Sequence, residues 1–410
     1  MGVATALSVP VPASDPASDR TAGPGRAHWL RVARDTADDL ATDAVARDQA
    51  GKAPVDEVSR LREAGLLRLL VPAELGGGGG DWPTAYAVVR EIAAADGAIG
   101  QLLGCHYFLS SGARFLTVPA LAARIERKSA AADWCWGGGV ADQELPLTLA
   151  RSARGHVLDG RQSFTTGALV ADRLLVRAQR ADTGEPFAVV VDTADPRVRV
   201  DDDAGTFGQR LAAGGSVEFD AVPVVADDVL GSLSADEGVL SPRTALTSPL
   251  GRLLSVQLLL GIAEGVLAEA REYSRAGRSA WRADSSQDPE LLSAYGELTI
   301  LARSASALNE QALEAVHGAL ARGEDVTYDE YAQTSALVAM AESAASRAAH
   351  ESTTRALDVI GVRSASSRLG FDRFWRNART HALHQPVAHR LREVGDYFLN
   401  DAHPPFVLPF

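Results

Sequence analysis

Cysteine and methionine are scarce in this chain of 410 residues, which contains two of each. The two cysteines, Cys105 and Cys135, are too few for the disulfide framework of a small secreted domain or for a zinc site without other ligands. Lysine and arginine number 40 against 53 aspartate and glutamate, so the net charge is -13. A nucleic-acid-binding face needs a basic excess, and this composition argues against one.

Long apolar runs are also missing. The longest, at residues 258–262, is soon followed by Glu264, so no segment is expected to cross a membrane. Residues 1–25 are rich in Pro, Ala, Ser and Asp and lack the apolar centre of a signal peptide, so we expect a mobile tail. The sequence therefore predicts a soluble, cytoplasmic protein.

The expected elements are helices, then strands, then helices. Apolar residues recur at helical spacing over 27–65, 82–95 and 99–108, and Gly65 is expected to end a helix in the left-handed conformation. Short alternating runs separated by turn residues then predict an antiparallel β module of about 80 residues. Its strands are expected at 147–150, 156–164, 173–178, 187–192, 198–201 and 216–221.

Long alanine-rich helical patterns follow the β module. They cover 253–275, 290–322, 328–359 and 387–399 with short breaks, which is typical of an antiparallel bundle. The sequence thus predicts an α+β protein in five parts. These are a disordered tail (1–25), an N-terminal helical domain (26–134), a β domain (135–240), a C-terminal helical bundle (241–400) and a C-terminal tail (401–410).

Two glycine runs stand where a ligand could approach the backbone. The run at 76–80 lacks the lysine and hydroxyl residue of a phosphate-binding loop and does not join a strand to a helix, so a connector is favoured. The run at 137–139 follows Trp136 at the junction between helical and β regions. Glycine there would let a planar ligand lie close to the backbone.

Histidine and threonine residues offer the candidate chemistry. His381 and His384 share one face if their segment is helical, and no good third ligand for a metal stands near them. A histidine at a helix end suits proton transfer, although a hydrogen-bonded structural histidine is the commoner case. Thr165 and Thr166 could donate hydrogen bonds to the polar edge of a heterocycle, or form an ordinary turn.

Taken together, these segments resemble the acyl-CoA dehydrogenase superfamily over about residues 30 to 400. The resemblance implies a helical domain, a β domain and a four-helix bundle, with flavin bound between the β domain and the bundle. The matching segments are 61–67, 71–76, 164–167, 216–223, 361–364 and 376–379.

The catalytic base of a dehydrogenase is missing from this pattern. Dehydrogenases of the family remove the α-proton of an acyl thioester with a glutamate at one of two places. This chain has Gln385 at the first and Gly251 at the second, with Glu264 and Glu269 further along the same expected helix. A neutral amide does not accept that proton. An FAD-dependent acyl-CoA dehydrogenase is therefore kept only as the alternative.

Residues 374–387 and 96–107 instead resemble the flavin-dependent monooxygenases of that superfamily, the dibenzothiophene monooxygenases and related two-component enzymes. The resemblance implies reduced FMN from a separate NAD(P)H-dependent flavin reductase, and a C4a-hydroperoxyflavin formed with O2. That species would oxygenate a sulfur-containing or aromatic small molecule in a homotetrameric enzyme, and FAD is the less favoured cofactor. An N-hydroxylating member of the superfamily and a non-enzymatic helical assembly protein remain alternatives.

The same resemblance assigns roles to single residues. His384 is expected at the reactive edge of the flavin, with His381 and Thr166 completing the catalytic set. His106 and Tyr107 are expected to face the substrate, although their apolar helix also favours a core position. No metal site is expected. The expected flavin-binding residues are Trp136, Phe164, Thr165, Thr166, Arg275, Arg278, Arg363 and His384, with the arginines at the phosphate.

Three departures separate the chain from the family pattern. Gly138 stands where the family has an asparagine side chain, Gln385 replaces an aspartate, and His389 replaces a tyrosine. We therefore expect a substrate other than dibenzothiophene itself.

Overall fold

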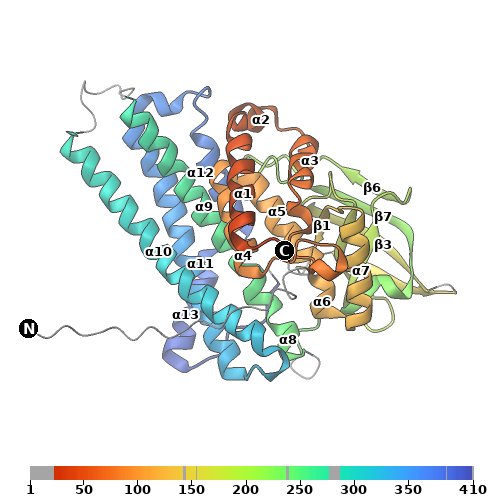
Figure 1. Cartoon of the computed structure of the whole chain (residues 1–410). Helices are drawn as coiled ribbons and strands as arrows, with labels where there is room; N and C mark the ends of the chain where they lie inside the picture. Colours follow the sequence, from red (N-terminus) through yellow and green to blue (C-terminus); the bar gives the residue numbers. More distant parts are fainter. Residues whose placement is uncertain are drawn as a thin grey trace, which may run out of the picture.

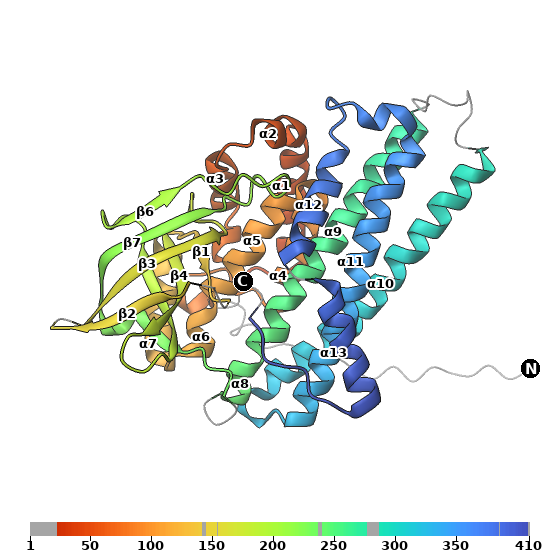
Figure 2. The same ribbon diagram turned by 180° about the vertical axis from the view of Figure 1, so that it is seen from behind.

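The computed structural model describes residues 23–141, 145–153, 155–236, 240–276, 287–384 and 386–408. Three groups of elements follow one another along the chain: N-terminal helices, a mixed sheet and a C-terminal helical bundle. In both ribbon views the N-terminal helices lie between the sheet and the bundle (Figures 1 and 2). The expected order of helices, strands and helices is confirmed.

Two of the N-terminal helices, α4 and α5, begin at aspartate side chains that cap them. Asp81 accepts a hydrogen bond from the Thr84 N–H at 2.9 Å, and Asp96 accepts one from the Ala98 N–H at 3.0 Å. Gly65 follows α3 with φ at 72°, so the predicted left-handed helix end is confirmed. The helices are α1 (Arg26–Ala41), α2 (Ala44–Ala50), α3 (Val55–Glu63), α4 (Trp82–Ala95), α5 (Gly97–Ser110), α6 (Gly112–Leu116) and α7 (Pro119–Ala131).

The glycine run at 76–80 packs tightly against the preceding turn. A Cβ on Gly77 would lie 2.2 Å from the Val71 carbonyl oxygen, and one on Gly78 would lie 2.6 Å from the Trp29 ring. Because only glycine permits these approaches, the run has a packing role in this fold.

The sheet is mixed, and not wholly antiparallel as the sequence suggested. Its strands run in the order β6-β7-β3-β2-β4-β5-β8, and β1 and β2 pair in parallel, one after the other, with the same edge of β4. The β2–β3 hairpin reverses the chain and β4 reverses it again, so β4 runs in the direction of β2. The strands are β1 (Trp136–Gly139), β2 (Leu147–Ser152), β3 (Gly155–Thr165), β4 (Arg173–Arg180), β5 (Pro186–Asp192), β6 (Val198–Asp201), β7 (Gly215–Val224) and β8 (Val229–Ser232).

The bundle is built around α9, which packs on α4, α5, α10, α11 and α12. The stretch Pro242–Arg275 is long and apolar enough to cross a membrane, which corrects the sequence expectation, but 78% of its most apolar window is buried inside the protein. Its apolarity therefore matches its central position. The helices are α8 (Pro242–Ala245), α9 (Thr247–Arg275), α10 (Pro289–Arg322), α11 (Tyr328–Ile360), α12 (Asp372–His384) and α13 (Val387–Asn400).

Candidate functional site

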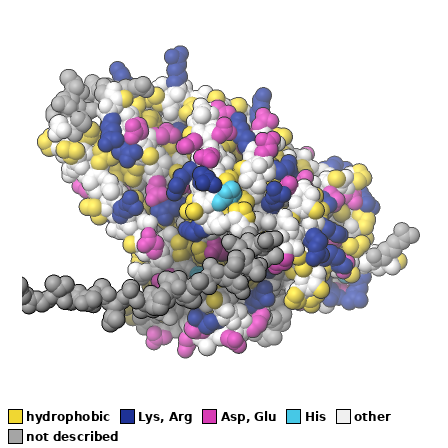
Figure 3. All heavy atoms as spheres, viewed as in Figure 1, with side chains coloured by type: hydrophobic (Ala, Val, Ile, Leu, Met, Phe, Trp, Pro, Cys, Tyr) yellow, Lys and Arg dark blue, Asp and Glu magenta, His cyan; other side chains and the backbone are white. Residues whose placement is uncertain are grey.

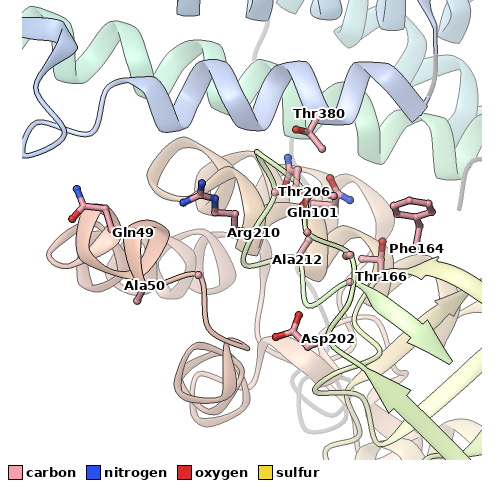
Figure 4. A pocket seen from close by; sticks show the side chains of 15 residues that line it. Gln49, Ala50, Gln101, Phe164, Thr166, Asp202, Thr206, Arg210, Ala212 and Thr380 are labelled. Carbon is pink, nitrogen blue, oxygen red and sulfur yellow. The ribbon is translucent and has the colours of Figure 1, made fainter.

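A cavity of about 350 Å³ lies where the three groups of elements meet (Figure 4). Each group contributes one part of the wall, so segments far apart in the sequence meet around one space. The wall is formed by residues 49–51 at the end of α2, Gln101 on α5, Phe164 and Thr166 at the end of β3, the segment 202–214 between β6 and β7, and Thr380 on α12.

The β-domain part of the wall is a strained turn at the end of β3. Phe164 has φ at 53°, an unusual value for an aromatic residue, and its side chain is 62% exposed. The next wall residue, Thr166, accepts a hydrogen bond at its carbonyl from the Gly138 N–H at 2.9 Å. A Cβ on Gly138 would lie 2.2 Å from the Leu175 carbonyl oxygen, so no side chain fits there. The turn therefore carries the Phe164 ring and the Thr166 hydroxyl next to the glycine residues of β1.

Two other residues expected at the flavin lie behind this wall. Thr165 is buried beneath the turn. Trp136 is buried as well, and its indole N–H donates to the Ser129 hydroxyl at 2.9 Å. Neither side chain lines the cavity in the structure.

Helix α12 forms the bundle side of the site. His381 is buried on it, and its Nδ1 lies 3.2 Å from Oε1 of Gln101, which lines the cavity. His384 is the last residue of α12, so the expected shared helical face with His381 is confirmed at the level of the backbone. The side chain of His384, all of Gln385 and all of Arg278 lie outside the described residues.

His106 and Tyr107 occupy a different place from the one expected. Both are fully buried, and the Tyr107 hydroxyl donates to the Leu66 carbonyl at 3.0 Å. The His106 ring bonds the Leu67 carbonyl through Nε2 at 2.7 Å and accepts from the Trp136 N–H through Nδ1 at 3.1 Å. Burial lowers the pKa of His106 to about 4, so the ring is neutral at pH 7. These contacts hold the turn after α3 against β1 and leave both side chains away from the cavity.

Two of the three arginines expected at the flavin phosphate, Arg275 and Arg363, are exposed at one end of the bundle. Arg275 ends α9, and Arg363 lies on the short helical turn Gly361–Ala365 that follows α11. Neither residue lines the cavity of its own chain.

The cavity wall also contains polar residues that the sequence analysis did not identify. Among them are Gln49, Asp202 and Arg210, which come from two segments without a chemical motif. Arg210 donates to the Asp48 carbonyl at 3.3 Å. The only sequence signal for this part of the site is the concentration of glycine between residues 205 and 215.

Two buried wall atoms have no hydrogen-bond partner among the described residues, the Thr380 hydroxyl oxygen and Oε1 of Gln209. An unsatisfied buried polar group costs about 1–3 kcal/mol. A ligand that presents both a donor and an acceptor would satisfy the pair. The polar edge of an isoalloxazine ring carries both, so these residues fit a flavin.

The acidic residues that could replace a dehydrogenase base are engaged elsewhere. Glu264 receives two hydrogen bonds from Arg90, at 2.6 and 2.9 Å, and Glu269 pairs with Arg373. Among the described residues, Asp202 is the only carboxylate that lines the cavity, and no group of three His, Cys, Asp or Glu is placed to hold a metal ion.

N-terminal helices between a mixed sheet and a C-terminal helical bundle, with a cavity where the three groups meet, define an acyl-CoA dehydrogenase-like fold (Figures 1 and 2). The family model of the acyl-CoA dehydrogenase N-terminal domain matches residues 28–115, and that of the C-terminal domain matches residues 253–389. The chain belongs to the acyl-CoA dehydrogenase family.

Similar proteins of this family are monooxygenases. Dibenzothiophene monooxygenase of Rhodococcus erythropolis is 35% identical over 392 residues, which are 92% of this chain and 94% of that protein. The probable FMNH2-dependent monooxygenase SfnC of Pseudomonas putida is 32% identical, over 92% of this chain and 95% of its own length. The crystal structure of FMN-bound TdsC from Paenibacillus sp. A11-2 superposes with a TM-score of 0.88 at 32% identity, covering 93% of this chain and all of that one.

Proposed function

We propose that the chain is a two-component flavin-dependent monooxygenase that uses FMNH2 and O2 to oxygenate a sulfur-containing or aromatic small molecule. The observation that carries the proposal is the composition of the cavity wall. Gln101, an exposed phenylalanine and three threonines line the space, and the buried His381 lies behind Gln101 in contact with its side chain. No glutamate lines the cavity among the described residues. The likeness to monooxygenases over nine-tenths of the chain supports the same reading.

Bound reduced FMN supplies the activation of dioxygen, and the residues of the chain hold the ring and manage protons. Phe164 and Thr166 would contact the ring from the β domain, and Thr380 and Gln209 would hydrogen-bond to its polar edge. His381 and His384 supply the proton that the departing oxygen needs, since histidine changes its charge near neutral pH. The small apolar residues Ala204 and Ala212 help to keep water from the wall.

The family resemblance assigns the phosphate of FMN to Arg275, Arg278 and Arg363, which would hold it through their guanidinium groups. Since Arg275 and Arg363 do not line the cavity of their own chain, their contribution depends on a second copy of the chain. This requirement supports a homotetramer, in which the bundle end of one subunit approaches the cavity of another.

The remaining partners follow from this chemistry. Reduced flavin comes from an NAD(P)H-dependent flavin reductase in the same compartment, which we take to be the cytoplasm. On the face shown in Figure 3, acidic and basic side chains are interspersed and form no continuous basic patch of the kind that binds nucleic acid.

The test is a single turnover with separately reduced FMN. Purified protein is mixed without oxygen with photoreduced FMN and dibenzothiophene or methyl phenyl sulfide, then exposed to aerated buffer, and sulfoxide and hydrogen peroxide are quantified. A colourless preparation that yields sulfoxide supports the proposal. A yellow preparation that retains FAD and oxidises butyryl-CoA without forming any oxygenated product contradicts it and favours the dehydrogenase.

A further inference from the structure

Arg376 lies on α12 one helical turn before Thr380 and joins three other residues through its side chain. Its side chain is only 14% exposed, and it pairs with both carboxylate oxygens of Asp48, whose side chain is 10% exposed. The guanidinium also donates to the Phe207 carbonyl at 3.0 Å and to the Asp372 carboxylate at 2.8 Å. A planar guanidinium with five N–H donors can make these four bonds to three partners at once, whereas a lysine ammonium has only three donors.

Asn377, the next residue, ties α12 to the same loop through a second pair of bonds. Its side-chain oxygen accepts from the Gln209 N–H at 2.7 Å, and its carbonyl accepts from the Gln209 amide at 3.1 Å. Gly208 lies directly against the helix between these contacts, because a Cβ there would lie 2.1 Å from the Arg376 carbonyl oxygen. The loop is therefore bound to α12 through main chain and side chains together.

The third connection joins α2 to the loop, through the bond from Arg210 to the Asp48 carbonyl. The three segments thus form a closed triangle of hydrogen bonds: α2 with α12, α12 with the loop, and the loop with α2. Each segment supplies cavity wall, namely residues 49–51, the segment 202–214 and Thr380. Arg376 and Asn377 line no part of the cavity themselves.

We propose that Arg376 and Asn377 form an interlock that sets the spacing of the three cavity walls and so positions the flavin-contacting groups of the site. Both are positioning residues, which act through Asp48 and Gln209. The effect of the interlock on flavin binding rests on the proposed function, whereas the existence of the interlock does not. Helix α12 carries Thr380 and His381, so a loosened triangle would move the wall hydroxyl and the histidine relative to Thr166. Displacements of a fraction of an ångström at such groups are enough to impair oxygen transfer.

The experiment compares Asp48→Asn with Asp372→Asn in the full chain. Both changes remove a carboxylate from the same guanidinium, but Asp372 is 53% exposed and lies outside the triangle. Amide hydrogen exchange of residues 202–214 is measured in flavin-free protein, together with the Kd for reduced FMN, the share of consumed oxygen released as hydrogen peroxide, and the Tm. We expect Asp48→Asn to exchange faster in this segment, to bind reduced FMN about tenfold more weakly and to release more peroxide, with Asp372→Asn within about twofold of wild type.

Two outcomes overturn the inference. If amide hydrogen exchange of residues 202–214 is unchanged in Asp48→Asn, the interlock does not exist, whatever the flavin affinity is. If exchange is faster but the flavin affinity and the share of peroxide are unaltered, the interlock stabilises the fold and does not position the flavin-contacting groups. A lower Tm would not change that conclusion. Should Asp48→Asn fail to fold, Arg376→Lys replaces it, since lysine keeps the charge facing Asp48 but loses the simultaneous bond to Phe207. If the wild-type protein binds no reduced FMN, the proposed function fails, and the exchange measurement still decides whether the interlock exists.

Discussion

His106 shows how burial decides what a histidine does in this fold. Its two ring nitrogens are both used, one toward the Leu67 carbonyl and one toward the Trp136 N–H, with no water-exposed atom left to exchange protons. The sequence could place this residue on an apolar helix but could not show that its partners were backbone groups from two distant segments. The residue therefore belongs to the frame of the site.

The lowered pKa of His106 makes acid destabilising. Its pKa is about 4 in the folded protein and near 6.5 when unfolded, so between these values the unfolded chain binds one more proton. Stability is therefore complete above about pH 6.5 and falls by ~1.4 kcal/mol per pH unit toward pH 4. Urea unfolding at pH 7, 6 and 5 measures the slope. His106→Gln should flatten it, whereas the same change at His317, on the exposed face of α10, should leave it unchanged.

His384 is the residue on which the proposed oxygen transfer depends most directly. His384→Phe should keep the fold and the oligomer but separate oxygen consumption from product formation, since the proton donor is lost while the ring-binding residues remain. We expect at least ~100-fold less product per oxygen consumed, with the balance released as hydrogen peroxide. A peroxide assay beside product chromatography measures the ratio, and an unchanged product yield would remove His384 from the assigned role.

The contact between Gln101 and His381 offers a change of charge without a change of shape. A carboxylate in place of the Gln101 amide would stabilise the protonated form of the His381 imidazole. Gln101→Glu should therefore shift the pH profile of the product-to-peroxide ratio upward. Gln101→Met, which removes the partner without adding charge, should lower the ratio with no upward shift.

At the scale of elements, the sequence predicted most of the helices and strands because their patterns are local. Six of the strands carry alternating apolar residues, and the expected ranges differ from the observed ones by a few residues at most. Strands β1 and β8 were not predicted: β1 reads Trp-Gly-Gly-Gly and has no alternation, and β8 is four residues long. Their pairing depends on β4 and β5, which are distant in the sequence, so no local pattern marks them.

The 202–214 segment lies so close to α12 that one added methyl group at Gly208 should change the site. Gly208→Ala would place a Cβ against the Arg376 carbonyl and the Thr380 hydroxyl, so the loop must move away from the helix. We expect at least ~10-fold weaker binding of reduced FMN, by fluorescence titration, with a smaller loss of overall stability. Gly214→Ala is the matched control in the same segment, because its Cβ would meet its nearest neighbour at an ordinary 3.9 Å. Equal effects of the two changes would contradict the argument.

At the scale of the whole molecule, the site combines residues that motifs reveal with residues that they do not. Phe164, Thr166 and His381 belong to segments that resemble the family, and the structure brings all three to the junction of the groups. Gln49 and Arg210 come from segments without such a pattern. Their role arises only when α2 and the loop before β7 meet α12, and that is a property of the tertiary packing.

The bundle also holds one helix with its apolar side outward. Arg252 and Arg390 bond Glu342 at 3.0 Å each, and Arg252 bonds Glu393 at 3.0 Å, a buried cluster that fastens α13 to α9 and α11. Leu391, Phe398 and Leu399 on the other side of α13 are exposed, the last two by 85% and 79%. A stripe of this kind, fixed by buried charges, is typical of a surface that another subunit covers.

This surface gives the test of the proposed homotetramer. Phe398→Asp should lower the mass measured by light scattering below four times 43.1 kDa, because a charge would have to be buried in the contact. If Arg275 and Arg363 reach the flavin phosphate only across subunits, the same variant should also bind reduced FMN at least ~10-fold more weakly. Val55→Asp, at an exposed position on α3, should alter neither quantity. A Phe398→Asp protein that no longer assembles but keeps its affinity for reduced FMN would show that one chain completes the site alone. The phosphate would then need ligands from the cavity wall. Arg210 is the only cationic residue in that wall among the described residues.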